Sequence, residues 1–86
     1  MGKYINPPSM EKEEFLALHG QRISTEEVLN FNFDGSKLPV CLVDNGWMTA
    51  AGIADTEHER DAFADPNDHR PKKWYSVSVE LLKPYL

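Results

Sequence analysis

The segment 38–55, LPVCLVDNGWMTAAGIAD, constrains the fold of this chain more than any other part of it. Two apolar runs flank Asn45-Gly46, a pair that favours a two-residue type I′ turn because both central residues of that turn need a positive φ. We therefore expect a β-hairpin over residues 38–54. In the register of a two-residue turn, Asp44 lies opposite Trp47.

This expected hairpin has two unlike apolar faces, because successive side chains of a strand point to opposite sides. The bulky face carries Leu38, Val40, Leu42 and Ile53. The flat face carries small or flexible side chains, namely Cys41, Val43, Met48, Ala50 and Gly52. We assign the bulky face to a core beneath helices. The flat face must be covered by the protein's own helices or by a partner.

A third strand is expected over residues 73–79, where apolar and polar side chains alternate. Tyr75, Val77 and Val79 should join the bulky face, while Trp74 and Ser76 point to the other side. A third strand or a packed helix is needed because an isolated hairpin is marginally stable.

Three short helices are expected around this sheet. Ser9 can cap a helix over 10–19 that ends at Gly20, with Phe15 and Leu18 on its buried stripe. Residues 20–24 should then form a connection.

The second and third helices share the spacing of a capping box. Ser24 precedes a helix over 25–31, with Val28 and Leu29 turned inward, and Thr56 precedes a helix that ends near residue 64. Ala62 and Phe63 are the expected inward anchors of the third helix.

These elements predict an α+β fold, with a small antiparallel sheet of three main strands, hairpin 38–54 plus strand 73–79, and two or three short helices. Its 86 residues form a single domain, 1–86, in which residues 1–9 are an extended N-terminal segment containing Pro7 and Pro8. A chain of this size buries only about 60–65% of its unfolded surface, so its stability margin is thin.

Composition limits the partners of this chain. It carries 14 acidic and 9 basic residues, a formal net charge of −5, which argues against direct nucleic-acid binding. The single cysteine, Cys41, cannot form an intramolecular disulfide, and neither an apolar signal region nor a membrane-spanning run is evident. We expect a cytoplasmic protein that does not contact a membrane.

Residues 55–69 hold the densest group of titratable side chains. His58 and Asp61 share a helix face, and His69 could add a ligand from the following loop, so these three are the candidates for a divalent-metal site in a small metal-dependent enzyme. Their order matches no established metal motif, and the alternative is a solvated helix face. We therefore expect no metal.

The same segment supports a different hypothesis, in which the protein is an acidic mimic of nucleic acid that blocks a basic cleft. Its acidic surface would consist of Asp55, Glu57, Glu59, Asp61 and Asp65. If these carboxylates are instead paired with nearby basic residues, the hypothesis loses its basis.

No motif for catalysis or cofactor binding is evident in the sequence. Cys41 lies in an apolar strand, where a reactive thiolate is disfavoured, and GSKLP lacks the first glycine of a phosphate-binding loop. We therefore expect no enzymatic activity and no cofactor.

The run HRPKKW, residues 69–74, is the only basic cluster, and we expect it to pair with the acidic helix before it. Tryptophan is enriched at interface hot spots. The candidate partner-binding residues are Trp47, Met48, Thr49, Arg70, Trp74 and Ser76.

The runs PVCLVDNGWMTAAGIAD and RPKKWYSVSVELLKPYL, within residues 38–86, resemble small uncharacterised accessory proteins encoded by bacteriophages and prophages. This resemblance implies a role in binding a host or phage protein, in some cases as an inhibitor of a host defence system, and a location in the host cytoplasm. It implies no catalytic residues.

The leading hypothesis is therefore a non-enzymatic protein-interaction module. It would present a sheet face or a strand edge to a protein partner, which could be a host protein. A homodimer is a further expectation, since apolar side chains lie on both faces of the sheet.

Overall fold

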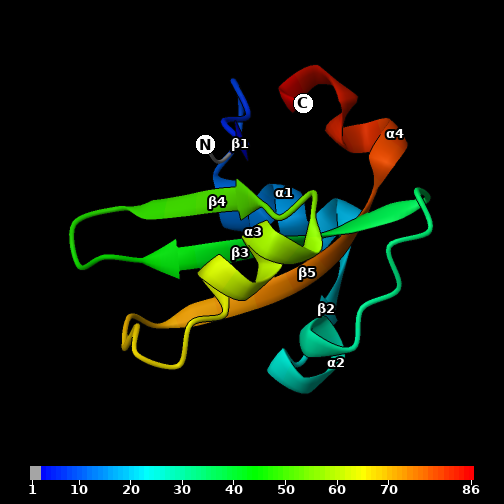
Figure 1. The fold of residues 1–86 in the computed structure, drawn as a ribbon. Coiled ribbons are helices and arrows are strands. Elements are labelled where there is room, and N and C mark those ends of the chain that lie inside the picture. The colour runs from blue at the N-terminus through cyan, green and yellow to red at the C-terminus, as the bar shows by residue number, and fades with distance from the viewer. Residues whose placement is uncertain (1–2) are drawn as a thin grey trace.

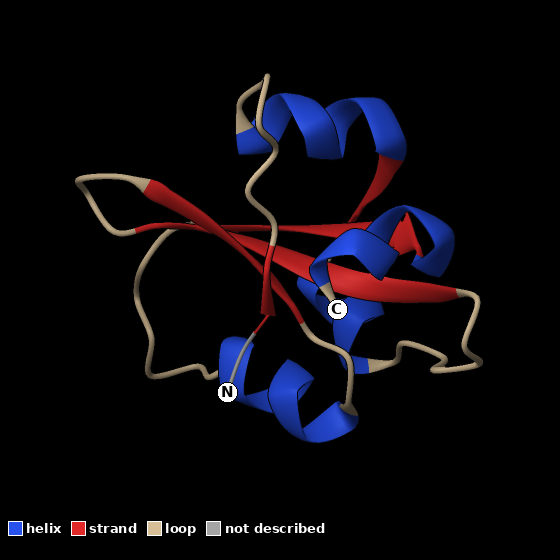
Figure 2. Ribbon diagram, turned by 90° about the horizontal axis from the view of Figure 1, so that it is seen from above, coloured by secondary structure: helices blue, strands red, loops and turns tan. Residues whose placement is uncertain are grey.

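The computed structural model describes residues 3–86, which form an antiparallel sheet with helices on both faces (Figures 1 and 2). The strands are β1 (Lys3–Tyr4), β2 (Gly20–Ile23), β3 (Lys37–Asp44), β4 (Thr49–Ile53) and β5 (Lys72–Ser78), in the order β1-β4-β3-β5-β2. The helices are α1 (Lys12–His19), α2 (Thr25–Leu29), α3 (Glu57–Phe63) and α4 (Val79–Leu82), followed by the 3₁₀ turn η1 (Lys83–Tyr85).

The α+β class is confirmed, and the three predicted strands are the centre of the sheet. Two short strands extend it at its edges, so the described part of the chain forms a five-stranded sheet. β1 lies in the segment 1–9 that was predicted to be extended, of which residues 1–2 are outside the described residues. Ile5 follows β1 and is fully buried.

The hairpin forms, but its register is two residues away from the predicted one. Asp44 pairs with Thr49, not with Trp47, and a four-residue loop, 45–48, connects the strands. The type I′ prediction was wrong because Asn45 keeps a negative φ and only Gly46 has a positive one, 91°. Because the side-chain period of a strand is two, this shift leaves every residue of the paired strands on its predicted face.

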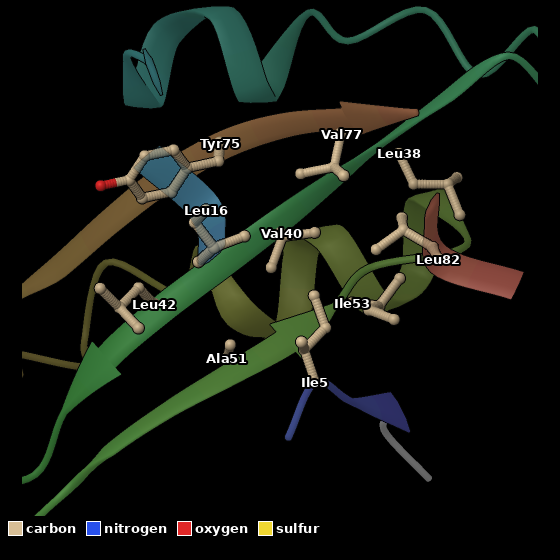
Figure 3. Packing of buried hydrophobic residues seen from close by; sticks show 10 residues of the cluster. All are labelled: Ile5, Leu16, Leu38, Val40, Leu42, Ala51, Ile53, Tyr75, Val77 and Leu82. Carbon is tan, nitrogen blue, oxygen red and sulfur yellow. The ribbon is translucent and has the colours of Figure 1, made fainter. Parts of the chain in front are cut away.

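The bulky face forms the larger core, as predicted (Figure 3). Helices α1 and α4 cover it through Leu16 and Leu82, both fully buried. The N-terminal segment adds Ile5 at its side. The buried cluster consists of Ile5, Leu16, Leu38, Val40, Leu42, Ala51, Ile53, Tyr75, Val77 and Leu82, with Val79 packed against it.

The flat face is covered by the protein's own helices, α2 and α3. The Phe63 ring of α3 lies directly on Gly52, where an added β-carbon would come within 2.5 Å of the ring carbon Cζ. The same ring meets Trp74 edge to face, with centroids 6.4 Å apart and planes at 83°. Val28 of α2 fills the other part of this face beside Cys41. No sheet face is therefore left to a partner at these positions.

The predicted connection 20–24 is mostly a strand. Helix α1 ends at His19, and Gly20 enters β2 directly in an extended conformation, with a φ of −109°. Strand β2 pairs with β5 and forms an edge of the sheet. A β-carbon at Gly20 would lie 2.9 Å from the Leu16 carbonyl oxygen, so glycine permits this close join of helix and strand.

The short helices contact the sheet through fewer side chains than the sequence suggested. Leu18, Leu29 and Ala62 were expected to be buried, but all three are exposed, Leu18 to 69%. Helices of five to eight residues rest on the sheet through about one turn, so one or two side chains reach it. Those side chains are Leu16, Val28 and Phe63.

The predicted caps of α2 and α3 are confirmed. The Ser24 hydroxyl accepts from the Glu27 amide at 3.1 Å, and the Glu27 carboxylate accepts from the Ser24 amide at 3.0 Å, which completes a capping box. In α3, the Thr56 hydroxyl accepts from the Glu59 amide at 3.1 Å. Helix α1 has no such side-chain cap, and it begins at Lys12, two residues later than predicted.

Candidate functional site

The loop 45–48, which we call the hairpin tip, projects from one end of the sheet (left side of Figure 1). Trp47 in this tip is 98% exposed, and Met48 beside it is 58% exposed. A protein surface normally carries apolar residues singly, but an indole with almost no contact to its own chain is a large apolar group in water. The tip is therefore the first candidate for a contact surface.

Hydrogen bonds hold the backbone of the hairpin tip in one conformation. The Asn45 side-chain oxygen accepts from the amides of Trp47 at 3.1 Å and Met48 at 3.0 Å. The Asp44 carboxylate accepts from the Gly46 amide at 2.8 Å. These side chains satisfy the turn locally, as Asx turns do. Trp47 is thus presented by a preorganised loop, which lowers the entropy lost on binding.

The loop between α3 and β5 lies at the same end of the sheet (Figure 1). The Asp44 amide donates to the Pro71 carbonyl at 3.0 Å, so this loop is joined to the base of the hairpin tip. Arg70, a predicted contact residue, precedes this junction and remains exposed. The structure therefore brings Trp47, Met48 and Arg70 to one end of the molecule.

Asp68 organises the basic residues of that loop. It binds Arg70 at 2.6 Å and Lys72 at 3.4 Å, and the adjacent Arg70 guanidinium is the main reason that the pKa of this carboxyl lies well below its usual range. Lys73 pairs with Glu13 of α1. The basic cluster was expected to pair with the acidic helix 57–63, but its ion partners are Asp68 and Glu13. Arg70 and Lys72 are close to Asp68 in the chain, and Lys73 lies on the face of β5 that α1 covers.

Two hollows flank the hairpin tip. A groove of about 250 Å³ is lined by Leu42 and Pro71 and by charged residues of both signs, namely Glu13, Arg22, Asp44, Lys72 and Lys73, with Thr49 at its side. A second hollow of about 220 Å³, which we call the edge hollow, is lined by Tyr4, Asn6, Lys12, Met48, Ala50 and Ala51. The Lys12 ammonium donates to the Thr49 carbonyl at 2.9 Å and lies between the two hollows.

Two of the predicted contact residues are inside the protein. Trp74 is 2% exposed beneath Phe63, and Ser76 is 9% exposed. Both were selected because they point to the flat face, and α2 and α3 close that face. Neither side chain is available to a partner, whereas the half-buried Thr49 is within reach at the root of the tip.

The carboxylates of the mimic hypothesis do not form one free acidic surface. Asp55 binds Lys3 at 2.6 Å, and this hydrogen bond lowers the pKa of its carboxyl, while Asp61 binds Arg60 at 2.8 Å. Glu59 is half-buried, with one carboxylate oxygen shielded from water and without a hydrogen-bond partner. Of these five carboxylates, Glu57 and Asp65 are the two that are exposed and form no ion pair with another described residue.

The candidate metal ligands do not converge. Over residues 3–86, no group of three His, Cys, Asp or Glu side chains is placed to hold a metal ion. His58, Asp61 and His69 are all exposed, and Asp61 is paired with Arg60. Burial raises the pKa of the Cys41 thiol to about 12, so at neutral pH this cysteine is an inert thiol of the core.

Tyr4, Asn6 and Lys12 line the edge hollow but were not among the predicted contact residues. The sequence predicted the extended segment 1–9 and the helix over 10–19, but it did not predict how either one contacts β4. β1 pairs with β4 and brings Tyr4 beside Gly52, while the first turn of α1 brings Lys12 to Thr49. The sequence signal for Tyr4 was its position next to Ile5 in an extended segment. If Ile5 faces the core, alternation turns Tyr4 toward solvent.

Comparison with protein-family models, with curated proteins and with solved structures finds no significant match to this chain. Within residues 3–86, no helix combines the length and the apolar character needed to cross a bilayer. The geometry of the hairpin tip is thus the main basis for assigning a function.

Proposed function

We propose that this protein is a non-enzymatic binding module that docks on a protein partner through the hairpin tip. The observation that carries the proposal is the 98% exposure of Trp47 on a loop fixed by three side-chain-to-backbone hydrogen bonds. A rigid aromatic anchor of this kind is typical of interface hot spots, which fill a pocket on the partner.

The available binding energy is large for one residue. An indole buries about 150–250 Å² on transfer from water, which corresponds to about 4–6 kcal/mol before the costs of association are subtracted. Met48 adds a flexible thioether that adapts to an irregular partner surface. Arg70 lies at the edge of this surface, where a charged side chain contributes to orientation more than to affinity.

The proposed contact is therefore a loop and not the sheet face that the sequence suggested, since both faces carry the protein's own helices. In line with the resemblance to phage accessory proteins, we propose a cytoplasmic partner encoded by the host or by a phage. Binding would block or modulate the activity of that partner, and no reaction would be catalysed.

The test compares the native protein with Trp47→Ala in an affinity capture from host lysate, with bound proteins identified by mass spectrometry. We expect a specific partner to be retained by the native protein and lost by Trp47→Ala. Leu18→Ala is the matched control, because Leu18 is 69% exposed on α1 but does not line the hairpin tip or either hollow. Equal capture by native protein and Trp47→Ala would contradict the proposal.

A further inference from the structure

The edge hollow exists because β1 is too short to cover the full edge of β4. β1 pairs only with Ile53 and Gly52, and the Ile5 amide adds a bond of 2.9 Å to the Ala51 carbonyl. Pro7 and Pro8 then end the strand, since proline has no amide hydrogen for a further ladder bond. Toward Thr49, where β1 no longer pairs with β4, the Lys12 ammonium donates to the Thr49 carbonyl at 2.9 Å.

The lining of the edge hollow suits an aromatic ring. Tyr4 is 49% exposed and offers a ring face, Met48 offers a polarisable sulfur, and Ala50 keeps the floor low. The Asn6 side-chain oxygen is an acceptor for an indole N–H, and the Lys12 ammonium can lie over the ring face. This is the environment in which tryptophan is bound, with an apolar body and one polar partner.

An anchor and a receptor therefore adjoin on one surface. Met48 lines the edge hollow, and Trp47 is the next residue along the chain. A two-fold axis close to the hairpin tip would bring each Trp47 to the edge hollow of the other copy, with the same contacts made twice. An acid and a base both lie next to Thr49 at the root of the tip, Asp44 on β3 and Lys12 on α1, so each copy offers charges of both signs beside the proposed contact.

We propose that the free protein forms a two-fold symmetric dimer in which Trp47 of each copy occupies the edge hollow of the other. This inference rests on the proposed function, because the dimer uses the same hairpin tip. It adds a way to regulate partner binding. Self-association covers the hairpin tip, so the partner must displace the second copy. The dimer would shield the apolar Trp47 side chain from water until the partner is present.

The test uses purified protein alone, by sedimentation velocity across a range from micromolar to millimolar concentration. We expect the native protein to shift from monomer to dimer, and Trp47→Ala and Tyr4→Ala to remain monomeric. The first variant removes the anchor and the second removes a wall of the receptor. Both residues are exposed, and thermal melts verify that each variant folds. Leu18→Ala should dimerise like the native protein.

Tryptophan fluorescence gives a second readout. Trp74 is already buried, so the change on association should come from Trp47, whose emission should move to shorter wavelength as concentration rises. Subtraction of the Trp47→Phe spectrum isolates this signal. A native protein that stays monomeric throughout overturns the proposed dimer. A dimer that persists in both Trp47→Ala and Tyr4→Ala shows that Trp47 and the edge hollow do not form its interface, which also overturns the proposal. Monomeric protein together with partner capture that still requires Trp47 would leave the proposed function standing.

Discussion

The face of the sheet under α1 and α4 and the face under α2 and α3 are both buried, but they are closed with side chains of different shape. The first is filled by branched aliphatic residues from sheet and helices, such as Val40 and Ile53, that interdigitate. The second has small residues on its strands, and the end of the Phe63 ring approaches the Gly52 backbone closely. The same strands thus support two packing solutions, and in the second an aromatic ring occupies the space that a side chain at Gly52 would take.

The largest expected effect is on the first face. Ile53 is fully buried there, so Ile53→Ala should lower the free energy of unfolding by about 2–5 kcal/mol, because it leaves a cavity among rigid neighbours. Urea denaturation followed by circular dichroism measures the change in midpoint. Cys41→Ala is the control on the second face, and we expect a smaller loss there. Equal losses would mean that the two faces do not differ in packing.

A glycine-to-alanine change probes the second face. Gly52→Ala should lower the free energy of unfolding by about 1–3 kcal/mol, because the new methyl group displaces the Phe63 ring. The matched control is the same substitution in a Phe63→Leu background, where the cost should fall. A double-mutant cycle from urea denaturation gives the coupling between the two sites. An unchanged cost in that background would show that the ring does not set the requirement for glycine.

The smallest expected effect concerns β1, which borders both faces. The Lys3 ammonium lowers the pKa of the Asp55 carboxyl, so this pair stabilises the folded state above the ordinary value of 3.8. That stabilisation is lost as pH falls through the lower pKa of the folded state. The stability difference between the native protein and Lys3→Met should therefore be present near neutral pH and vanish in acid, as measured by urea midpoints.

Lys83→Met is the control for this pH dependence. Lys83 pairs with Glu80 at 3.1 Å, but both side chains are more than half exposed, so water screens the pair. We expect no change in its urea midpoint with pH beyond that of the native protein. A Lys3→Met variant with the same behaviour would indicate that the Asp55 pair does not hold β1.

The two faces of the hairpin were predictable because they depend on the alternation of side chains along a strand. A register error of two residues does not change which face a side chain is on. The helix caps at Ser24 and Thr56 were predictable because they are local. Strand β2 was missed because an edge strand carries polar residues, here Gln21 and Arg22, that do not alternate with apolar ones.

The candidate site was only partly predictable for a related reason. Trp47 and Trp74 look alike in sequence, and alternation correctly placed Trp74 on the flat face. Its burial depends on the contact with Phe63 of α3, which is a property of tertiary packing and not of any local pattern. Tyr4 and Lys12 join the site through the β1–β4 pairing and a single long side chain, which are equally non-local.

The place of β5 in the sheet has a consequence for synthesis of the chain. β5 is the last strand to be made, yet it lies between β3 and β2 and is the only strand that pairs with β2 among the described residues. During synthesis on the ribosome, the backbone of the segment that becomes β2 therefore has no strand to pair with until residue 78 has emerged. Stalling before that point should leave a protease-sensitive chain, and folding should be a single late event.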